Sequence, residues 1–190
     1  WQEIFDILRK NQAKLTVGIT AAWVERKSTL VPFFKKFPEE AEALKLAARE
    51  GLVEIANHGY THCVVGRHLP RLFSSNRMYH REFWNWVPQD VQKEHIQVSQ
   101  EFLTGYFDCQ VVTFVPPGNV WTQETERIAL EHGLKLLSTN KPGSLMRYAG
   151  GDSVVAFHDL DIRVNGLHWF ENLIGKYKDK KIVTVRELAG

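Results

Sequence analysis

The stretch EIANHGYTH, residues 54–62, places two histidines four positions apart, immediately after an apolar run. That run, LVEIA at residues 52–56, has the length and composition of a buried β-strand. His58 and His62 are therefore expected at the carboxyl end of a strand, where ligands of parallel sheets bind. The chain has eight histidines, so the spacing alone is weak evidence, and it is the position at a strand end that favours a functional site.

Strand and helix patterns alternate along the rest of the chain. Short β-branched or apolar runs predict strands at residues 14–20, 52–56, 109–115, 134–139, 153–158 and 181–185. Amphipathic patterns predict helices at residues 1–12, 38–51, 90–106, 122–133 and 166–180. Because mostly short connections join these elements, the strands are expected to be parallel, in an α/β fold of one domain, residues 1–190.

The composition is that of an ordinary globular domain. Hydrophobic residues make up 44% and charged residues 24% of the 190 residues, and the net charge is +2. This charge is too small to indicate a nucleic-acid partner, and no apolar run approaches the roughly 20 residues of a membrane span. Two cysteines, Cys63 and Cys109, allow at most one disulfide and do not indicate a disulfide-built scaffold.

Polar and turn residues follow two other predicted strands. A Pro-Pro-Gly-Asn turn at residues 116–119 comes after the run at residues 109–115, and His158 ends the run at residues 153–158. Parallel strands end on the same edge of a sheet, so these residues are expected beside the histidine pair. Three imidazoles next to such a turn are typical of a metal-dependent hydrolase. The helical zinc-protease motif is excluded, because Gly59 stands where that motif needs glutamate.

Residues 57–89 show no clear helical or strand period and are expected to form a long loop after the histidines. The loop contains SSNRMYHREFWNW at residues 74–86, which carries Arg77, His80 and Arg81. Such side chains bind sugars or acids, so the loop is a candidate lid and the three residues are candidate substrate contacts. A solvated loop with an aromatic foot in the core explains the same stretch without a binding role.

The stretch EIANHGYTH resembles the second motif of the polysaccharide deacetylase family, in which a strand ends in Asn-His-(Ser/Thr)-x-x-His. TFVPPGN, residues 113–119, resembles the third motif, and VVAFHD, residues 154–159, resembles the fifth. The order and rough spacing of the three stretches agree with the family. The resemblance implies a distorted, incomplete (β/α) barrel, with the first strand missing from the given residues.

The same resemblance implies roles for individual residues. His58 and His62 would bind the catalytic divalent metal, zinc in the first place, with cobalt or nickel as alternatives. His158 would be the general acid that protonates the departing amine. Three turn residues would bind substrate: Pro117, Gly118 and Asn119.

Three departures separate the chain from the family pattern. No Asp-Asp pair occurs, although the family uses one for the third metal ligand and the general base. Val115 replaces an arginine that steadies this base, and Gly118 replaces an aromatic residue of the substrate groove. The helix that opens the chain at Trp1 has no capping residue before it. We therefore expect upstream residues that carry the first strand and the Asp pair.

The expected function is that of a metal-dependent hydrolase that removes N-acetyl groups from an amino sugar or polysaccharide, so a carbohydrate is the expected partner. A second class of function stays open, a catalytically inactive carbohydrate-binding domain that keeps the fold. An Asp pair shortly before Trp1 would favour the enzyme. An amidohydrolase-type barrel is disfavoured, because the His-x-His pair typical of its first strand is not found.

Overall fold

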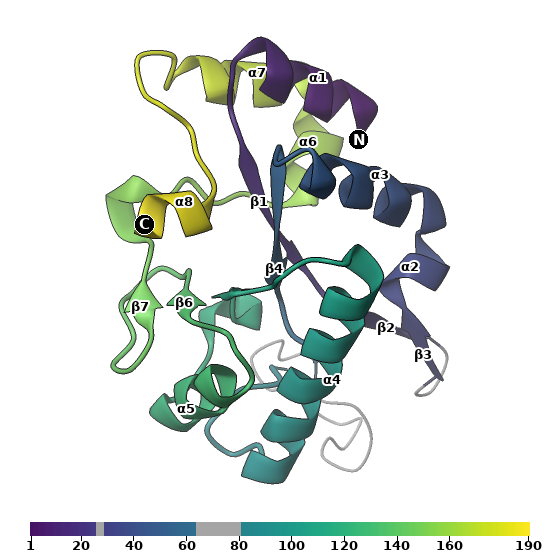
Figure 1. Cartoon of the computed structure of the whole chain (residues 1–190), viewed down its shortest axis with the longest axis vertical. Coiled ribbons are helices and arrows are strands. Elements are labelled where there is room, and N and C mark those ends of the chain that lie inside the picture. The colour runs from purple at the N-terminus through teal and green to yellow at the C-terminus, as the bar shows by residue number, and fades with distance from the viewer. Residues whose placement is uncertain (26–28, 64–80) are drawn as a thin grey trace.

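A parallel β-sheet forms the centre of the structure (Figure 1). The structure is a computed structural model that describes residues 1–25, 29–63 and 81–190. In these residues the strands lie in the order β1-β4-β5-β6-β7, and each neighbouring pair is parallel. The bounds are β1 Leu15–Ile19, β4 Val53–Asn57, β5 Thr113–Phe114, β6 Leu136–Leu137 and β7 Arg147–Tyr148. The predicted α/β fold is confirmed, and the described sheet is open at β1 and β7, as in an incomplete barrel.

Helices lie where the amphipathic patterns predict them. Their bounds are α1 Gln2–Lys10, α3 Pro38–Arg49, α4 Gln89–Phe107, α5 Gln123–Glu131 and α7 Leu167–Gly175. α4 buries one stripe of side chains with helical spacing and packs against β4, as does α3. α1 contacts α7 at the other end of the molecule (Figure 1). None of the helices in the described ranges is long and apolar enough to cross a membrane.

A β-hairpin that the sequence patterns did not predict follows β1. It consists of β2 Ala22–Glu25 and β3 Thr29–Pro32, which are antiparallel, and α2 Phe33–Lys36 follows it. The backbone N–H groups of Ala21 and Ala22 donate to the carbonyls of Gly59 and Tyr60, at 3.0 and 2.6 Å. The hairpin is thereby attached to the turn that carries the histidine pair.

The predicted strand at residues 153–158 is wrong. The 3₁₀ turn η5 Gly151–Ser153 opens this region, an irregular segment follows, and α6 Asp159–Asn165 begins after His158. Val155, expected in a buried strand, is 45% exposed. In the described residues the segment pairs with neither open edge of the sheet, at β1 or at β7. A β-branched run favours a strand only where a pleated surface can bury it.

The predicted last strand at residues 181–185 is also wrong. The backbone N–H of Lys14 donates to the carbonyl of Ile182 at 3.1 Å, so this segment contacts the chain just before β1. The hydroxyl of Thr184 then accepts the N–H of Glu187 at 3.2 Å and caps α8 Val185–Ala189. A capping residue at this point ends the extended run and begins a helix.

The buried carboxylate of Glu54 joins three elements across β4. It accepts hydrogen bonds from the hydroxyls of Thr16 on β1 and Thr113 on β5, at 2.8 and 2.5 Å. It also accepts the backbone N–H of Arg186 in α8 at 2.9 Å. A buried carboxylate is stable when donors of this kind surround it. Glu54 therefore ties the last helix to the sheet.

The end of the predicted long loop is anchored in the core. Phe83 is fully buried, and its ring meets that of Phe114 edge-on with 5.3 Å between centroids. Val87 is buried as well. The aromatic foot expected for this loop is therefore present. Arg77 and His80 lie outside the described residues, so their substrate contacts and the lid stay predictions.

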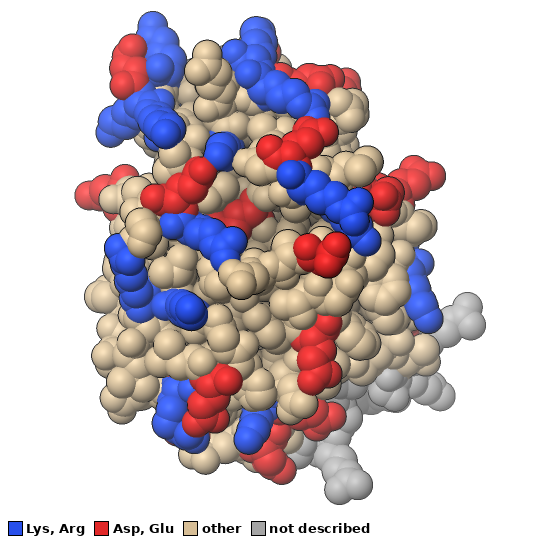
Figure 2. Space-filling view, viewed as in Figure 1, with Lys and Arg blue, Asp and Glu red and all other residues tan. Residues whose placement is uncertain are grey.

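Charged side chains of both signs are intermixed on the face shown in Figure 2. The exposed ion pairs of the chain include Lys10 with Glu171 at 2.7 Å and Lys14 with Glu187 at 2.5 Å. Exposed pairs of this kind contribute only about 0–1 kcal/mol each to stability. The fold is therefore stabilised mainly by its apolar core, which α1, α3 and α4 share with the sheet.

Candidate metal and substrate site

His58 follows the last residue of β4 and is oriented by a backbone carbonyl. Its Nδ1 atom lies 2.6 Å from the carbonyl oxygen of Val115, which follows β5. A carbonyl can only accept, so Nδ1 donates its proton and Nε2 keeps a free lone pair in the neutral ring. This is the arrangement that orients a metal-binding histidine in known sites. Val115 thus has a role through its backbone that its side chain did not suggest.

Both imidazoles of the pair are held neutral. Burial, together with the nearby charge of His62, lowers the pKa of His58 from 6.5 to about 4. Burial also lowers the pKa of His62, with a second contribution from the Arg81 guanidinium. The two ring centroids are 5.1 Å apart. Metal ions bind the neutral ring, so the low pKa values suit ligands at neutral pH.

The low pKa of His58 predicts that acid destabilises the metal-free protein. As the pH falls, the unfolded chain protonates His58 near its ordinary pKa of 6.5, whereas the folded chain resists down to about 4. The free energy of unfolding should therefore fall between about pH 6.5 and about pH 4, by up to about 3 kcal/mol. Urea unfolding of the parent and of His58→Gln at several pH values measures this component as a difference. A pH-independent difference would show that the folded protein does not hold the ring neutral.

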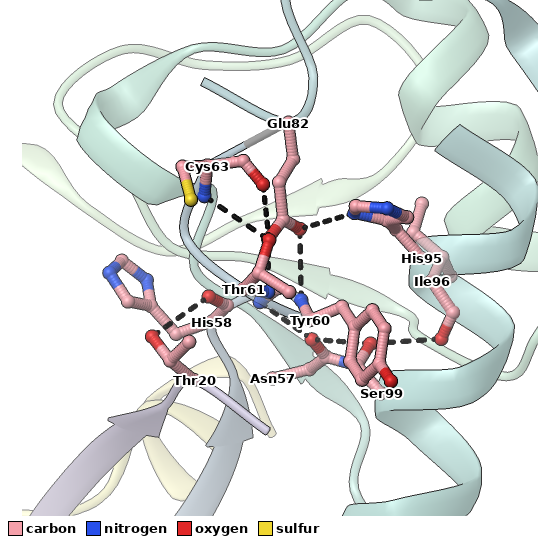
Figure 3. Close-up of polar contacts among 11 residues, drawn as sticks. Thr20, Asn57, His58, Tyr60, Thr61, Cys63, Glu82, His95, Ile96 and Ser99 are labelled. Carbon is pink, nitrogen blue, oxygen red and sulfur yellow. Dashed lines mark hydrogen bonds and ion pairs between the residues drawn. The ribbon is translucent and has the colours of Figure 1, made fainter. Parts of the chain in front are cut away.

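Asn57 shapes the turn after β4 from beneath. Its side chain is fully buried, and its Oδ1 accepts the backbone N–H of Gly59 at 2.9 Å. Its Nδ2 donates to Ser99 and Gln100 of α4, at 2.9 and 3.1 Å. These bonds link the strand end to α4, as Figure 3 shows for Ser99. Asn57 therefore acts as a turn residue that fixes the backbone position of His58 at the end of β4.

Arg81 lies between the second-motif histidines and the third-motif turn. Its Nη1 is 3.2 Å from both ring nitrogens of His62. A Cβ atom on Gly118 would overlap the guanidinium carbon of Arg81. Gly118 also has a φ of 64°, which favours glycine. The missing side chain at Gly118 therefore leaves the space that Arg81 fills.

The other third-motif residues are held by their neighbours. The short 3₁₀ helix η4 Pro117–Asn119 follows β5, and Pro117 is buried. Oδ1 of Asn119 accepts hydrogen bonds from the hydroxyl of Thr139 at 2.6 Å and the N–H of Asn140 at 3.3 Å. This side chain ties the turn to the segment after β6. Substrate contacts by Pro117, Gly118 and Asn119 stay predictions.

His158 caps α6 and has an exposed ring. Its side chain is 88% exposed, with Nδ1 3.7 Å from the Oδ2 atom of Asp161. That carboxylate also accepts the backbone N–H of His158, at 2.7 Å. The charge of His158 contributes to the lowered pKa of His62, so the two rings lie within electrostatic reach of each other. The general-acid role of His158 stays a prediction.

The two imidazoles form an incomplete ligand set. Residues 1–25, 29–63 and 81–190 contain no group of three or more His, Cys, Asp or Glu side chains arranged to hold a metal ion. His58 has the orientation and protonation of a ligand, so the donors that are present fit a metal. His62 fits once Arg81 turns away from its ring nitrogens. The third ligand and the base, expected upstream, stay predictions.

Glu82 belongs to the stretch of residues 74–86 that was expected to bind sugars or acids, yet its carboxylate is directed into the turn after β4 (Figure 3). Its side chain is 0% exposed. The one sequence signal was Gly59, which stands where the second motif usually has serine or threonine. A glycine inside a motif often marks a close approach by another group.

A model of the polysaccharide deacetylase family matches residues 1–137, more than half of the chain. The chain belongs to the polysaccharide deacetylase family. The expected family is thus confirmed, and the histidine pair and the third-motif turn both lie within the matched residues. His158 lies beyond it. No curated protein matches the chain significantly.

Several solved structures share the fold of this deacetylase family member. A CE4 family pseudoenzyme from Bacillus anthracis is 16% identical, with a TM-score of 0.57 over 100% of this chain and 60% of its own. A deacetylase from Streptococcus pyogenes in complex with acetate is 16% identical, with a TM-score of 0.50 over 76% of this chain and 57% of its own. The deacetylase domain of BpsB from Bordetella bronchiseptica is 17% identical, with a TM-score of 0.51 over 80% of this chain and 68% of its own. The chain therefore spans about 60% of the first two structures.

Proposed function

We propose that this family member is a metal-dependent hydrolase that removes N-acetyl groups from an amino sugar or polysaccharide. The observation that carries the proposal is the ring of His58, whose Nδ1–H bond to the Val115 carbonyl leaves Nε2 free as a ligand. The lowered pKa values of His58 and His62 support it, because they keep both rings neutral at neutral pH.

His58 and His62 would hold a divalent ion, zinc in the first place, with cobalt or nickel as alternatives. When bound, such an ion supplies Lewis acidity that activates water and polarises the amide carbonyl. The Val115 carbonyl fixes the ring of His58 for this role, whereas Arg81, which contacts both ring nitrogens of His62, would have to turn away from that ring. His158, exposed at the start of α6, would donate the proton to the departing amine.

The substrate would be a carbohydrate that carries acetamide groups. Arg81 offers several N–H donors next to His62 and the third-motif turn, where a sugar hydroxyl or the acetyl carbonyl could accept them. The ring of Pro117 lies close to the turn at Gly59. The space that an aromatic side chain usually takes in the family is filled here by the guanidinium of Arg81.

Acetate release from an N-acetylglucosamine oligomer tests the proposal. The full-length protein would be stripped of metal with a chelator and then assayed with and without added Zn²⁺, Co²⁺ or Ni²⁺. Loss of acetate release on chelation and its recovery with one of these ions is the expected result. Acetate release that chelation leaves unchanged would contradict a metal-dependent reaction.

A catalytically inactive carbohydrate-binding domain is the second candidate. One observation favours it: the described residues hold two imidazoles but no third metal donor, and Arg81 lies against one of the two rings. In that case calorimetry with the same oligomer should show binding, while no added ion should produce acetate.

Arg81 and Gly118 should behave as one unit in substrate binding. Arg81→Ala removes a charge-assisted hydrogen bond and should lower kcat/KM by about 10-fold to 100-fold. Gly118→Ala should cause a similar loss, because its Cβ displaces the same guanidinium. The double variant should therefore be no worse than either single one. Arg49→Ala, an exposed arginine on α3, is the control. Additive losses would show that the two residues act separately.

A further inference from the structure

The turn between the two histidines is built around one buried carboxylate. Oε2 of Glu82 accepts the backbone N–H of Tyr60 at 2.9 Å, and Oε1 accepts the backbone N–H of Thr61. The hydroxyl oxygen of Thr61 lies 2.9 Å from Oε1. Figure 3 shows the carboxylate pointing into the turn, whereas the ring of His58 points away from it. Both carboxylate oxygens are thus engaged by the turn itself.

The backbone of this turn depends on outside partners. Gly59 and His62 have positive φ values of 79° and 63°, so the chain is left-handed on both sides of Tyr60 and Thr61. The carbonyls of Gly59 and Tyr60 are bonded to the residues that open the β2–β3 hairpin. The inward N–H groups of Tyr60 and Thr61 are bonded to Glu82. Without the carboxylate, two buried donors would lose their acceptor.

Gly59 and Glu82 form a matched pair. A Cβ atom on Gly59 would lie 2.6 Å from Oε2 of Glu82, so a serine or threonine at this position excludes the observed carboxylate. The second motif of the family usually has serine or threonine there. In this chain Gly59 lacks that side chain, and the Glu82 carboxylate, from the end of the loop predicted at residues 57–89, fills the space. Phe83, buried next to Glu82, anchors that carboxylate in the core.

We propose that Glu82 is a positioning residue that sets the relative placement of His58 and His62. It acts through the backbone of Tyr60 and Thr61, between the two histidines, and is not itself a ligand. Nδ1 of His95 in α4 lies 3.4 Å from Oε2, on the side of the carboxylate that faces α4 (Figure 3). The inference rests on the proposed metal role of the two histidines.

Another buried carboxylate in the chain provides a matched control. Glu126 of α5 is 2% exposed and accepts the backbone N–H groups of Ser144, Leu145 and Met146, at 3.0, 2.8 and 2.8 Å. It organises a different loop, the one before β7. Glu126→Ala should therefore cost stability without affecting the histidine pair. The comparison separates a general loss of stability from a loss of positioning.

The test measures Zn²⁺ affinity by calorimetry, and melting temperature, on the full-length parent, Glu82→Ala, Glu82→Gln and Glu126→Ala. Glu82→Ala should weaken Zn²⁺ binding by about 10-fold to 100-fold, the usual effect of removing a group that orients a ligand. Glu82→Gln keeps the size and one acceptor oxygen, so its loss should be smaller. If Glu82→Ala does not fold, the Zn²⁺ affinity of Glu82→Gln tests the proposal in its place. Glu126→Ala should bind Zn²⁺ as the parent does. A folded Glu82 variant with parental Zn²⁺ affinity would overturn the proposal.

A second measurement, NMR of the imidazole resonances in metal-free protein, does not depend on Zn²⁺ binding. The signals of His58 and His62 should change in the Glu82 variants and stay unchanged in Glu126→Ala. If the parent itself binds no Zn²⁺, the proposed metal function fails, and these signals alone decide about Glu82. Unchanged signals in a folded Glu82 variant would then reject the positioning role.

Discussion

Replacing His58 or His62 with alanine should lower the affinity for Zn²⁺ by about 100-fold or more. The loss of a direct ligand is expected to exceed the 10-fold to 100-fold effect of removing a residue that only orients one. Nε2 of His58 is the metal-binding nitrogen of a ring that the Val115 carbonyl holds in place, so the substitution removes an oriented ligand. Equilibrium dialysis or calorimetry on the metal-free full-length protein gives the affinities directly.

His168→Ala is the control for this prediction. His168 lies exposed on α7, outside the turn after β4, so its loss should leave Zn²⁺ affinity unchanged. Circular dichroism and melting temperature must show that all variants are folded. If His58→Ala and His62→Ala both bind Zn²⁺ as tightly as the parent, the pair does not form a metal site, and the carbohydrate-binding alternative gains support.

Replacing His158 with alanine should slow turnover by about 10²-fold to 10⁴-fold, equivalent to ~3–5 kcal/mol of activation free energy. The reason is that the departing amine then lacks a positioned proton donor. The loss should appear mainly in kcat and should shrink for substrates with better leaving groups. Because the side chain is 88% exposed, the free energy of unfolding should change by no more than about 0.5 kcal/mol.

Three measurements on the one variant distinguish the possible roles of His158: Zn²⁺ content, melting temperature and kcat. A slow, folded and metal-loaded protein is the expected result. Loss of the metal would make His158 a ligand, and a lower melting temperature with normal turnover per folded molecule would make it a packing residue. Unchanged kcat in a folded, metal-loaded protein would remove the acid role.

Local patterns determined most of the secondary structure of this chain. The helical spacing of apolar residues placed α1, α3, α4, α5 and α7, because each helix buries one face and shows it in the sequence. The apolar run before His58 placed β4, whose every residue is buried between helices and neighbouring strands. The order of the second and third motifs was also enough to indicate the family that the comparison confirms.

Sequence patterns failed where a segment's conformation depends on what lies beside it. Residues 153–158 have strand-forming composition, yet they pair with no strand of the described sheet, and Val155 is 45% exposed. Residues 181–185 end in a helix cap at Thr184. The spacing of apolar residues indicates which side chains can be buried. A strand also needs a hydrogen-bonding partner, which only the tertiary structure supplies.

The candidate site divides in the same way. The sequence alone determined that His58 and His62 follow a buried strand, because the apolar run at residues 52–56 directly precedes them. Only the tertiary structure decided what holds them: the Val115 carbonyl on one ring, Arg81 in the space left by Gly118, and the Glu82 carboxylate under the turn. These partners lie far away in sequence, and two of the contacts involve backbone atoms, which every residue carries. Gly59 and Gly118 show only that a side chain is missing, and which group fills each space is decided once the sheet and its loops have packed together.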